Sequence, residues 1–311
     1  MDNGTSSNDS LTFPPSQEPY HKYMLYTTFV IQMFVITFGT FNNALFCFVI
    51  VRFPHLHTKF NALAFAVSAG DFLASAVATP VSIVLIMYHH RMHSLQTPIC
   101  FLSGFLINLF KWSTVLTTTE IAAIRARCVF SSHLWLLSKR KIALIVVCNM
   151  LITAAFSTYR TYFSSHSVCL QMLNNKSRLL NIAVFGTLYV ILVLCYAVLC
   201  IVTYRRSAGI SRKERCSVRY EIATLRASAI IVTSYLILHL PYISYTLLLH
   251  FGVYTDRSYY SHSFFVSFFS LCNVADAITF FVTSKQYRKH VFLVLGTRNV
   301  SDRQVSVSIT T

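Results

Sequence analysis

Charged residues are scarce in this chain: Asp, Glu, Lys and Arg together make up only 12% of its 311 residues. Soluble domains carry about 25% charge. The composition therefore excludes an ordinary soluble protein, because a soluble core could not hide a chain that is 55% hydrophobic. Acidic residues are the scarcest, 10 against 26 Lys and Arg, which gives a formal net charge of +16. In a soluble protein such an excess would indicate nucleic-acid binding. In a membrane protein the placement of the basic residues along the chain is more informative than their number, because it indicates which segments lie in the cytoplasm.

Features that would indicate other classes are also missing. The polar residues 1–23 contain no basic segment followed by an apolar one, so we expect no cleavable signal peptide. We find no internal repeat of the kind that transporters carry. We find no nucleophile elbow, phosphate loop or metal cluster, so we do not expect an enzyme. The run His89–His93 holds three histidines that might suggest zinc, but a polar loop is the favoured interpretation.

Long apolar stretches are what the chain does have. Each is at least the ~17 residues needed to cross ~30 Å of hydrocarbon at ~1.5 Å rise per residue. Backbone groups in lipid must bond within their own segment, so the stretches predict seven helices. An odd number of crossings places the two termini on opposite sides of the membrane. The predicted spans are Met24–Val51, Phe60–His90, Thr97–Ile124, Ile142–Tyr159, Leu179–Tyr204, Ala227–Thr255 and Ser258–Ser284.

Most of the Lys and Arg residues fall in the segments that would share one side of the membrane. Short loops rich in these residues stay in the cytoplasm, so we expect a plasma-membrane protein with its N-terminus outside and its C-terminus inside. The basic inner face should attract anionic membrane lipid. The predicted parts are an extracellular tail (1–23), the membrane bundle (24–284), an amphipathic helix on the inner leaflet (285–295) and a cytoplasmic tail (296–311).

The outer side carries candidate modification sites. Cys100 and Cys169 are the two cysteines that fall outside, where a disulfide is chemically permitted. A bridge between them is favoured over two free thiols. Asn3, Asn8 and Asn175 each begin an Asn-x-Ser/Thr triplet on this side and are candidate glycosylation sites.

Several short motifs lie in the predicted spans, each at a position and spacing that is characteristic of one family of membrane proteins. They are Gly39–Asn43, Ala69–Asp71, the interval from Cys100 to Arg125, Tyr235–Tyr242 around Pro241, and Asp276–Phe280 followed by Tyr287. Together they resemble the rhodopsin-like (class A) G-protein-coupled receptors over about residues 24–295. The resemblance implies an all-α membrane protein, a seven-transmembrane helix bundle plus a short amphipathic eighth helix. It also implies an extracellular ligand, a heterotrimeric G protein and arrestin as partners, and no nucleic acid.

The chain also departs from the family's motifs. Ile124-Arg125-Ala126 replaces Asp-Arg-Tyr, His239 replaces the sixth-helix tryptophan, and Ala277 and Phe280 replace a proline and a tyrosine. These departures leave open a receptor-like protein that binds a ligand or a partner receptor without coupling. A transporter is a further, less favoured alternative.

The resemblance assigns coupling roles to three residues. Arg125 and Glu221 fall at the inner ends of the third and sixth spans, where the family pairs an arginine with an acid in its inactive state. Breaking a partly desolvated pair leaves a charge to be satisfied elsewhere, so such a pair can act as a switch. The alternative is two solvated charges. Tyr196 matches the family's fifth-helix tyrosine.

Five polar residues within the spans resemble the family's sodium pocket. Two carboxylates placed close together repel each other, and a bound cation or a shared proton relieves the repulsion. The alternative is a plain hydrogen-bonded polar core. The five residues are Asn43, Asp71, Thr114, Asn273 and Asp276.

Lys111 lies inside the third span, where an ammonium group needs a partner. It is a candidate anchor for an anionic ligand; pairing with an internal acid or snorkelling outward are the alternatives. The first turns of this span carry no acid, so an amine ligand is not expected and a peptide or an anionic small molecule remains. The other pocket candidates, which are also explained by simple packing, are Trp112, Phe185, Tyr189, His239 and Tyr242.

Overall fold

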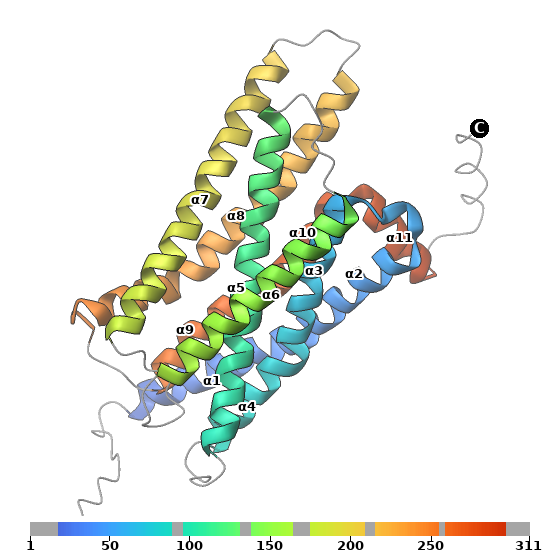
Figure 1. Ribbon diagram of the computed structural model, residues 1–311. Coiled ribbons are helices and arrows are strands. Elements are labelled where there is room, and N and C mark those ends of the chain that lie inside the picture. Colours follow the sequence, from blue (N-terminus) through green and yellow to red (C-terminus); the bar gives the residue numbers. More distant parts are fainter. Residues whose placement is uncertain are drawn as a thin grey trace, which may run out of the picture.

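A computed structural model describes residues 18–88, 96–130, 138–163, 175–208, 215–254 and 259–296. Within these ranges the chain is built of helices joined by short turns, and no strand occurs among the described residues (Figure 1). The helices are α1 (Glu18–Phe34), α2 (Thr40–Arg52), α3 (Lys59–Leu73), α4 (Thr79–Tyr88), α5 (Gln96–Phe130), α6 (Lys139–Phe163), α7 (Asn175–Ala208), α8 (Arg215–His250), α9 (Tyr259–Ser270), α10 (Cys272–Thr283) and α11 (Lys285–Val294).

Three of the predicted spans contain an irregularity. A π-helical turn, Val35–Gly39, joins α1 to α2 in one continuous rod, and a second one, Ala74–Ala78, joins α3 to α4 just before Pro80. At Leu271 the chain passes from α9 to α10. Pro241, in contrast, lies inside α8 without ending it. Wider turns release backbone carbonyls from the regular pattern, and Thr79 Oγ1 donates to the carbonyl of Ala74 at 2.9 Å.

Six stretches are long and apolar enough to cross a membrane, so the chain is a multi-pass membrane protein. They correspond to six of the predicted spans. The third predicted span, Thr97–Ile124, lies in the 35-residue helix α5, but the side chains of residues 96–100 lie outside the described part, so its crossing of the membrane stays a prediction. Its buried polar side chains are Ser103, Asn108, Lys111, Ser113, Thr114, Thr117, Thr118 and Thr119.

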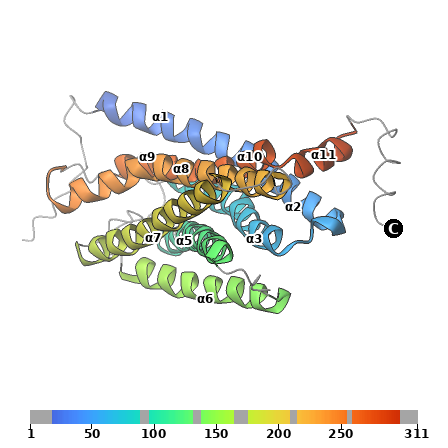
Figure 2. The same ribbon diagram turned by 90° about the horizontal axis from the view of Figure 1, so that it is seen from above.

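The packing of α5 explains how it tolerates these residues. It contacts α3, α6 and α7, and in Figure 2 it lies between α6 and the rest of the bundle. α1 and α6 lie at opposite edges of the same view. The outward faces of the peripheral helices carry large exposed apolar side chains, such as Phe41, Leu144, Leu151, Val190 and Leu240. These faces suit lipid, whereas α5 is surrounded by protein on several sides.

The helices extend beyond the predicted spans at several ends. α1 begins at Glu18 rather than at Met24, and α8 begins at Arg215, well before Ala227. Hydropathy marks where a helix meets lipid, but a helix continues into water while its backbone bonds are kept. The short α11 begins immediately after α10, and the Ser284 hydroxyl accepts a hydrogen bond from the Tyr287 N–H at 3.2 Å. This serine is the N-cap of α11.

Candidate functional site

Two buried carboxylates, Asp71 on α3 and Asp276 on α10, form the centre of the site. The Asp71 side chain accepts a hydrogen bond from the Thr114 hydroxyl of α5 at 3.0 Å. The Asp276 side chain accepts one from the Tyr235 hydroxyl of α8 at 2.8 Å. The two carboxylates are also close enough to interact with each other. Four helices therefore meet around one pair of acids.

Asn43 joins α2 to this group. Its side-chain amide donates to the carbonyl of Gly39 at 2.9 Å and to the carbonyl of Asn273 at 2.6 Å. Of the five residues predicted to form one polar region, Asp71 is bonded to Thr114, and Asn43 is bonded to the backbone carbonyl of Asn273.

Five buried oxygens, two of them on the carboxylates themselves, have no hydrogen-bond partner among the described residues. Leaving such atoms unsatisfied is costly, so each indicates a partner such as water, a proton or an ion. Hard cations bind oxygen ligands of this kind. Within the described ranges no three His, Cys, Asp or Glu side chains gather as a metal cluster. The unpartnered oxygens are Asn43 Oδ1, Ser68 Oγ, Asp71 Oδ2, Ser75 Oγ and Asp276 Oδ1.

Lys111 lies in an aromatic cage. Its Nζ is 3.7 Å from the ring centroids of both Tyr242 and Phe269, and 5.4 Å from that of Phe185. An ammonium over aromatic faces is attracted by the ring quadrupole. The side chain is only 7% exposed, so the alternative in which Lys111 snorkels outward is wrong. The cage keeps a positive charge within the bundle, between α5, α7, α8 and α9.

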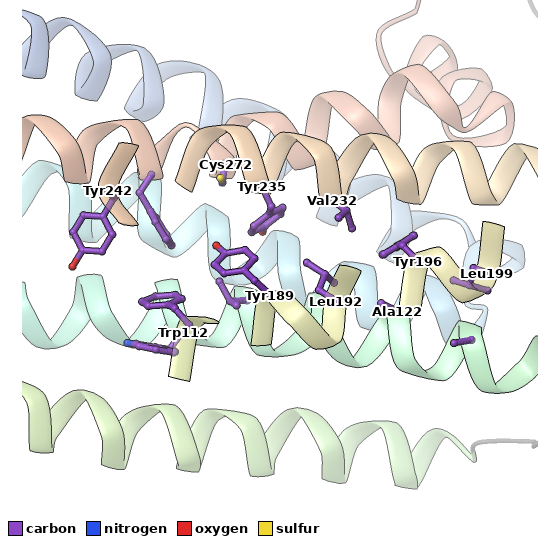
Figure 3. Close-up of a cluster of buried hydrophobic side chains, with 14 residues drawn as sticks. Trp112, Ala122, Tyr189, Leu192, Tyr196, Leu199, Val232, Tyr235, Tyr242 and Cys272 are labelled. Atoms are coloured by element: carbon purple, nitrogen blue, oxygen red, sulfur yellow. The ribbon is translucent and has the colours of Figure 1, made fainter. Parts of the chain in front are cut away.

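His239 lies directly beside this cage. Its ring stacks on Phe269 with centroids 3.7 Å apart and meets the rings of Tyr189 and Tyr235 edge-on. Its Nε2 is 3.2 Å from the Cys272 sulfur, and the residue is completely buried. Figure 3 shows Tyr189, Tyr235 and Cys272 gathered in the middle of this cluster.

The remaining pocket candidates belong to the same buried cluster. Trp112 stacks on Phe185 at 3.9 Å and meets Phe156 of α6 edge-on at 4.6 Å. Tyr196 packs further along the cluster, near Ala122 and Leu199 in Figure 3. The structure thus brings Lys111, Trp112, Phe185, Tyr189, His239 and Tyr242 together.

Other sequence-predicted residues fall outside the described residues. Arg125 lies in the backbone of α5 and Glu221 in that of α8, but their side chains are outside the described part. The same holds for the modification candidates Asn3, Asn8, Cys100, Cys169 and Asn175.

Sequence reasoning missed Tyr235, Phe269 and Cys272 as site residues. Tyr235 was visible only as one letter of a motif, four residues before His239. It also missed Glu120, an acid inside the third predicted span. The Glu120 carboxylate accepts a hydrogen bond from the Asn149 amide of α6 at 2.7 Å. An acid in an apolar stretch is itself a signal, because such a group needs a partner.

At the end of the bundle that carries α11, histidines from two segments meet. The rings of His55 and His290 are 4.5 Å apart between the turn Pro54–Leu56 and α11. Partial burial lowers the pKa of His55, and the nearby His290, His57 and Lys289 lower it further.

A known receptor is similar to part of this chain. No family model matches the chain. The chain is similar to neuropeptide FF receptor 1 of Homo sapiens, with 23% identity over 177 residues. The match covers 52% of this chain and 40% of that receptor, so it spans less than half the length of the relative.

Proposed function

We propose that this protein is a cell-surface receptor that carries an extracellular signal to a heterotrimeric G protein. The observation that carries the proposal is the buried carboxylate pair Asp71 and Asp276, bonded to α5 and α8 within an apolar bundle. Ionisable groups inside a membrane are costly and usually mark a functional site. Here they bond together helices whose relative movement would carry the signal.

The proposal includes α5 as the third of seven membrane crossings. Its 35 residues are ample for ~30 Å of hydrocarbon at ~1.5 Å rise per residue. Two of its polar side chains are bonded to neighbouring helices, Thr114 to Asp71 of α3 and Glu120 to Asn149 of α6. The N-terminus then lies outside the cell and the basic inner face meets the G protein, with arrestin as a further partner. α11 is the amphipathic eighth helix, lying against lipid headgroups.

We further propose that a sodium ion binds between Asp71 and Asp276. The unpartnered oxygens Asp71 Oδ2 and Asp276 Oδ1 supply ligands of the right chemistry. A monovalent cation would relieve the repulsion between the carboxylates. The alternative is a proton shared by the pair, with water on the remaining oxygens.

The ligand site is proposed around Lys111. The cage of Phe185, Tyr242 and Phe269 presents an ammonium group together with apolar surface. A ligand with an acidic group on an apolar body fits this combination. The relative is by its name a receptor for a neuropeptide, which keeps a peptide with a free carboxylate among the candidates.

The coupling proposal is tested by signalling without ligand. Glu221→Ala removes the acid that would restrain Arg125, so it should raise basal G-protein activation in cells several-fold. Glu214→Ala, which removes another acid of the same predicted inner region, is the matched control and should leave the baseline unchanged. Surface expression of each variant is measured in parallel.

A second function is favoured by specific residues. Ile124, Ala277 and Phe280 depart from the family's signalling motifs, as expected of a receptor-like protein that binds without coupling. If neither the wild type nor Glu221→Ala activates any G-protein class at normal surface expression, the coupling proposal fails and this alternative replaces it.

A further inference from the structure

Two polar contacts join α8 to α10 like the rungs of a ladder. The Tyr235 hydroxyl donates to Asp276 Oδ2 at 2.8 Å, and His239 Nε2 lies 3.2 Å from the Cys272 sulfur. Each pair is four residues, about one helical turn, from the other on both helices. The order is reversed along α10, as expected for antiparallel neighbours. We call these two contacts the polar ladder.

Asp276 belongs to the ladder and to the carboxylate pair at the same time. Its Oδ2 accepts from Tyr235, while its Oδ1 has no hydrogen-bond partner among the described residues. The two oxygens of the Asp276 carboxylate thus differ in their partners. One is bonded to α8, and the other is available to the cation proposed between Asp276 and Asp71.

Tyr235 is buried with only 1% of its surface exposed, so no bulk water replaces its hydroxyl at Asp276. A hydroxyl donating to a charged carboxylate makes a shorter and stronger bond than one donating to a neutral group. A bound cation keeps the Asp276 carboxylate ionised and would therefore strengthen this bond. The bond exists only while α8 lies against α10.

We propose that Tyr235 is a positioning residue of the cation site, and that through it the bound cation and the close packing of α8 on α10 stabilise each other. The inference rests on the cation site of the proposed function. Movement of α8 away from α10 would remove the hydroxyl from Asp276 and weaken cation binding. By linkage, cation binding opposes that movement to the same degree.

The second contact of the polar ladder, between His239 and Cys272, lies next to the Lys111 cage. His239 stacks on Phe269, and Phe269 also lies under the Lys111 ammonium. A group that displaces Phe269 would disturb the His239 contact with Cys272, one turn from Asp276. The ladder thus connects the proposed ligand site to the proposed cation site by direct contacts.

The test uses the purified full-length protein in detergent, with sodium chloride as the probe and choline chloride holding the ionic strength constant. The thermal unfolding midpoint of the wild type should rise with sodium. Tyr235→Phe should shift the half-maximal sodium concentration upward by at least ~10-fold, because it removes a hydrogen bond to a charged group. Tyr287→Phe is the matched control: this tyrosine is also buried but belongs to the separate cluster around Phe46, and the variant should keep the wild-type sodium response.

The outcomes separate the two proposals. If the unfolding midpoint of the wild type does not change with sodium, the proposed cation site is wrong. A wild type that responds, with a Tyr235→Phe variant that responds equally or at lower sodium, overturns the role of Tyr235 and leaves the cation site standing. If Tyr235→Phe does not fold, the inference is tested instead by amide hydrogen exchange of the wild type with and without sodium. Sodium should then protect amides of both α8 and α10, and protection confined to α3 and α10 overturns the inference.

Discussion

At the scale of single residues, one close approach limits what the bundle accepts. Gly39 lies in the π-helical turn between α1 and α2, facing Ser75 in the corresponding turn between α3 and α4. A Cβ atom added at Gly39 would lie 2.5 Å from the Ser75 hydroxyl oxygen and 3.1 Å from its Cβ. The two irregular turns therefore pack against each other through a position that has no side chain.

We predict that Gly39→Ala destabilises the protein, because the added methyl group forces the two turns apart. Overpacking of this kind costs about 1–3 kcal/mol. The measurement is the thermal unfolding midpoint of the purified protein, which should fall. Gly70→Ala is the matched control, since its added Cβ would meet only the Thr114 hydroxyl at an ordinary 3.7 Å. Equal midpoints for the two variants would contradict the prediction.

At the scale of helices, the sequence predicted the elements better than their contacts. Apolar stretches of sufficient length located the helices because lipid requires backbone bonds to stay within a segment. The last turn of α7 and the first turns of α8 were missed because they are polar. The contact of His239 with Cys272 could not be predicted, because it depends on how two helices are rotated about their axes. The grouping of Asp71 with Asp276 came from a family resemblance rather than from spacing.

α5 shows the same limit in another form. Its buried polar residues are what bond it to its neighbours. Thr114 reaches Asp71 on α3, and Glu120 is bonded by Asn149 on α6. Hydropathy alone treats these residues as unfavourable, whereas the fold gives them partners.

The bond between α5 and α6 yields a prediction for this interface. Asn149→Leu removes the donor from the half-buried Glu120 carboxylate and should lower the free energy of unfolding by about 1.5–3 kcal/mol. Cys148→Leu, at the exposed neighbouring position, is the control and should change the thermal midpoint little. Combining Glu120→Gln with Asn149→Leu should cost less than the sum of the single changes, since both remove one contact. Full additivity would show that the two side chains do not interact energetically.

At the scale of the whole molecule, the decisive question is the number of crossings. If all helical stretches cross, including the polar α5, the count is odd and the two ends of the chain lie on opposite sides. If only the six other stretches cross, the ends share one side. The excess of Lys and Arg on the predicted inner segments favours the first arrangement, with the N-terminus outside.

Epitope tags at the two ends distinguish these arrangements. We predict that an antibody against an N-terminal tag labels intact cells, while one against a C-terminal tag labels them only after permeabilisation. Asn3→Gln and Asn8→Gln should each reduce any glycan-dependent mass, because both triplets would face outward; Asn299→Gln, in a triplet predicted to face the cytoplasm, is the control. Labelling of both tags in intact cells, or of neither, would mean an even number of crossings. The basic face would then no longer be separated from the proposed ligand site by the membrane, and a signal could not pass inward through the contacts of α5, α8 and α10.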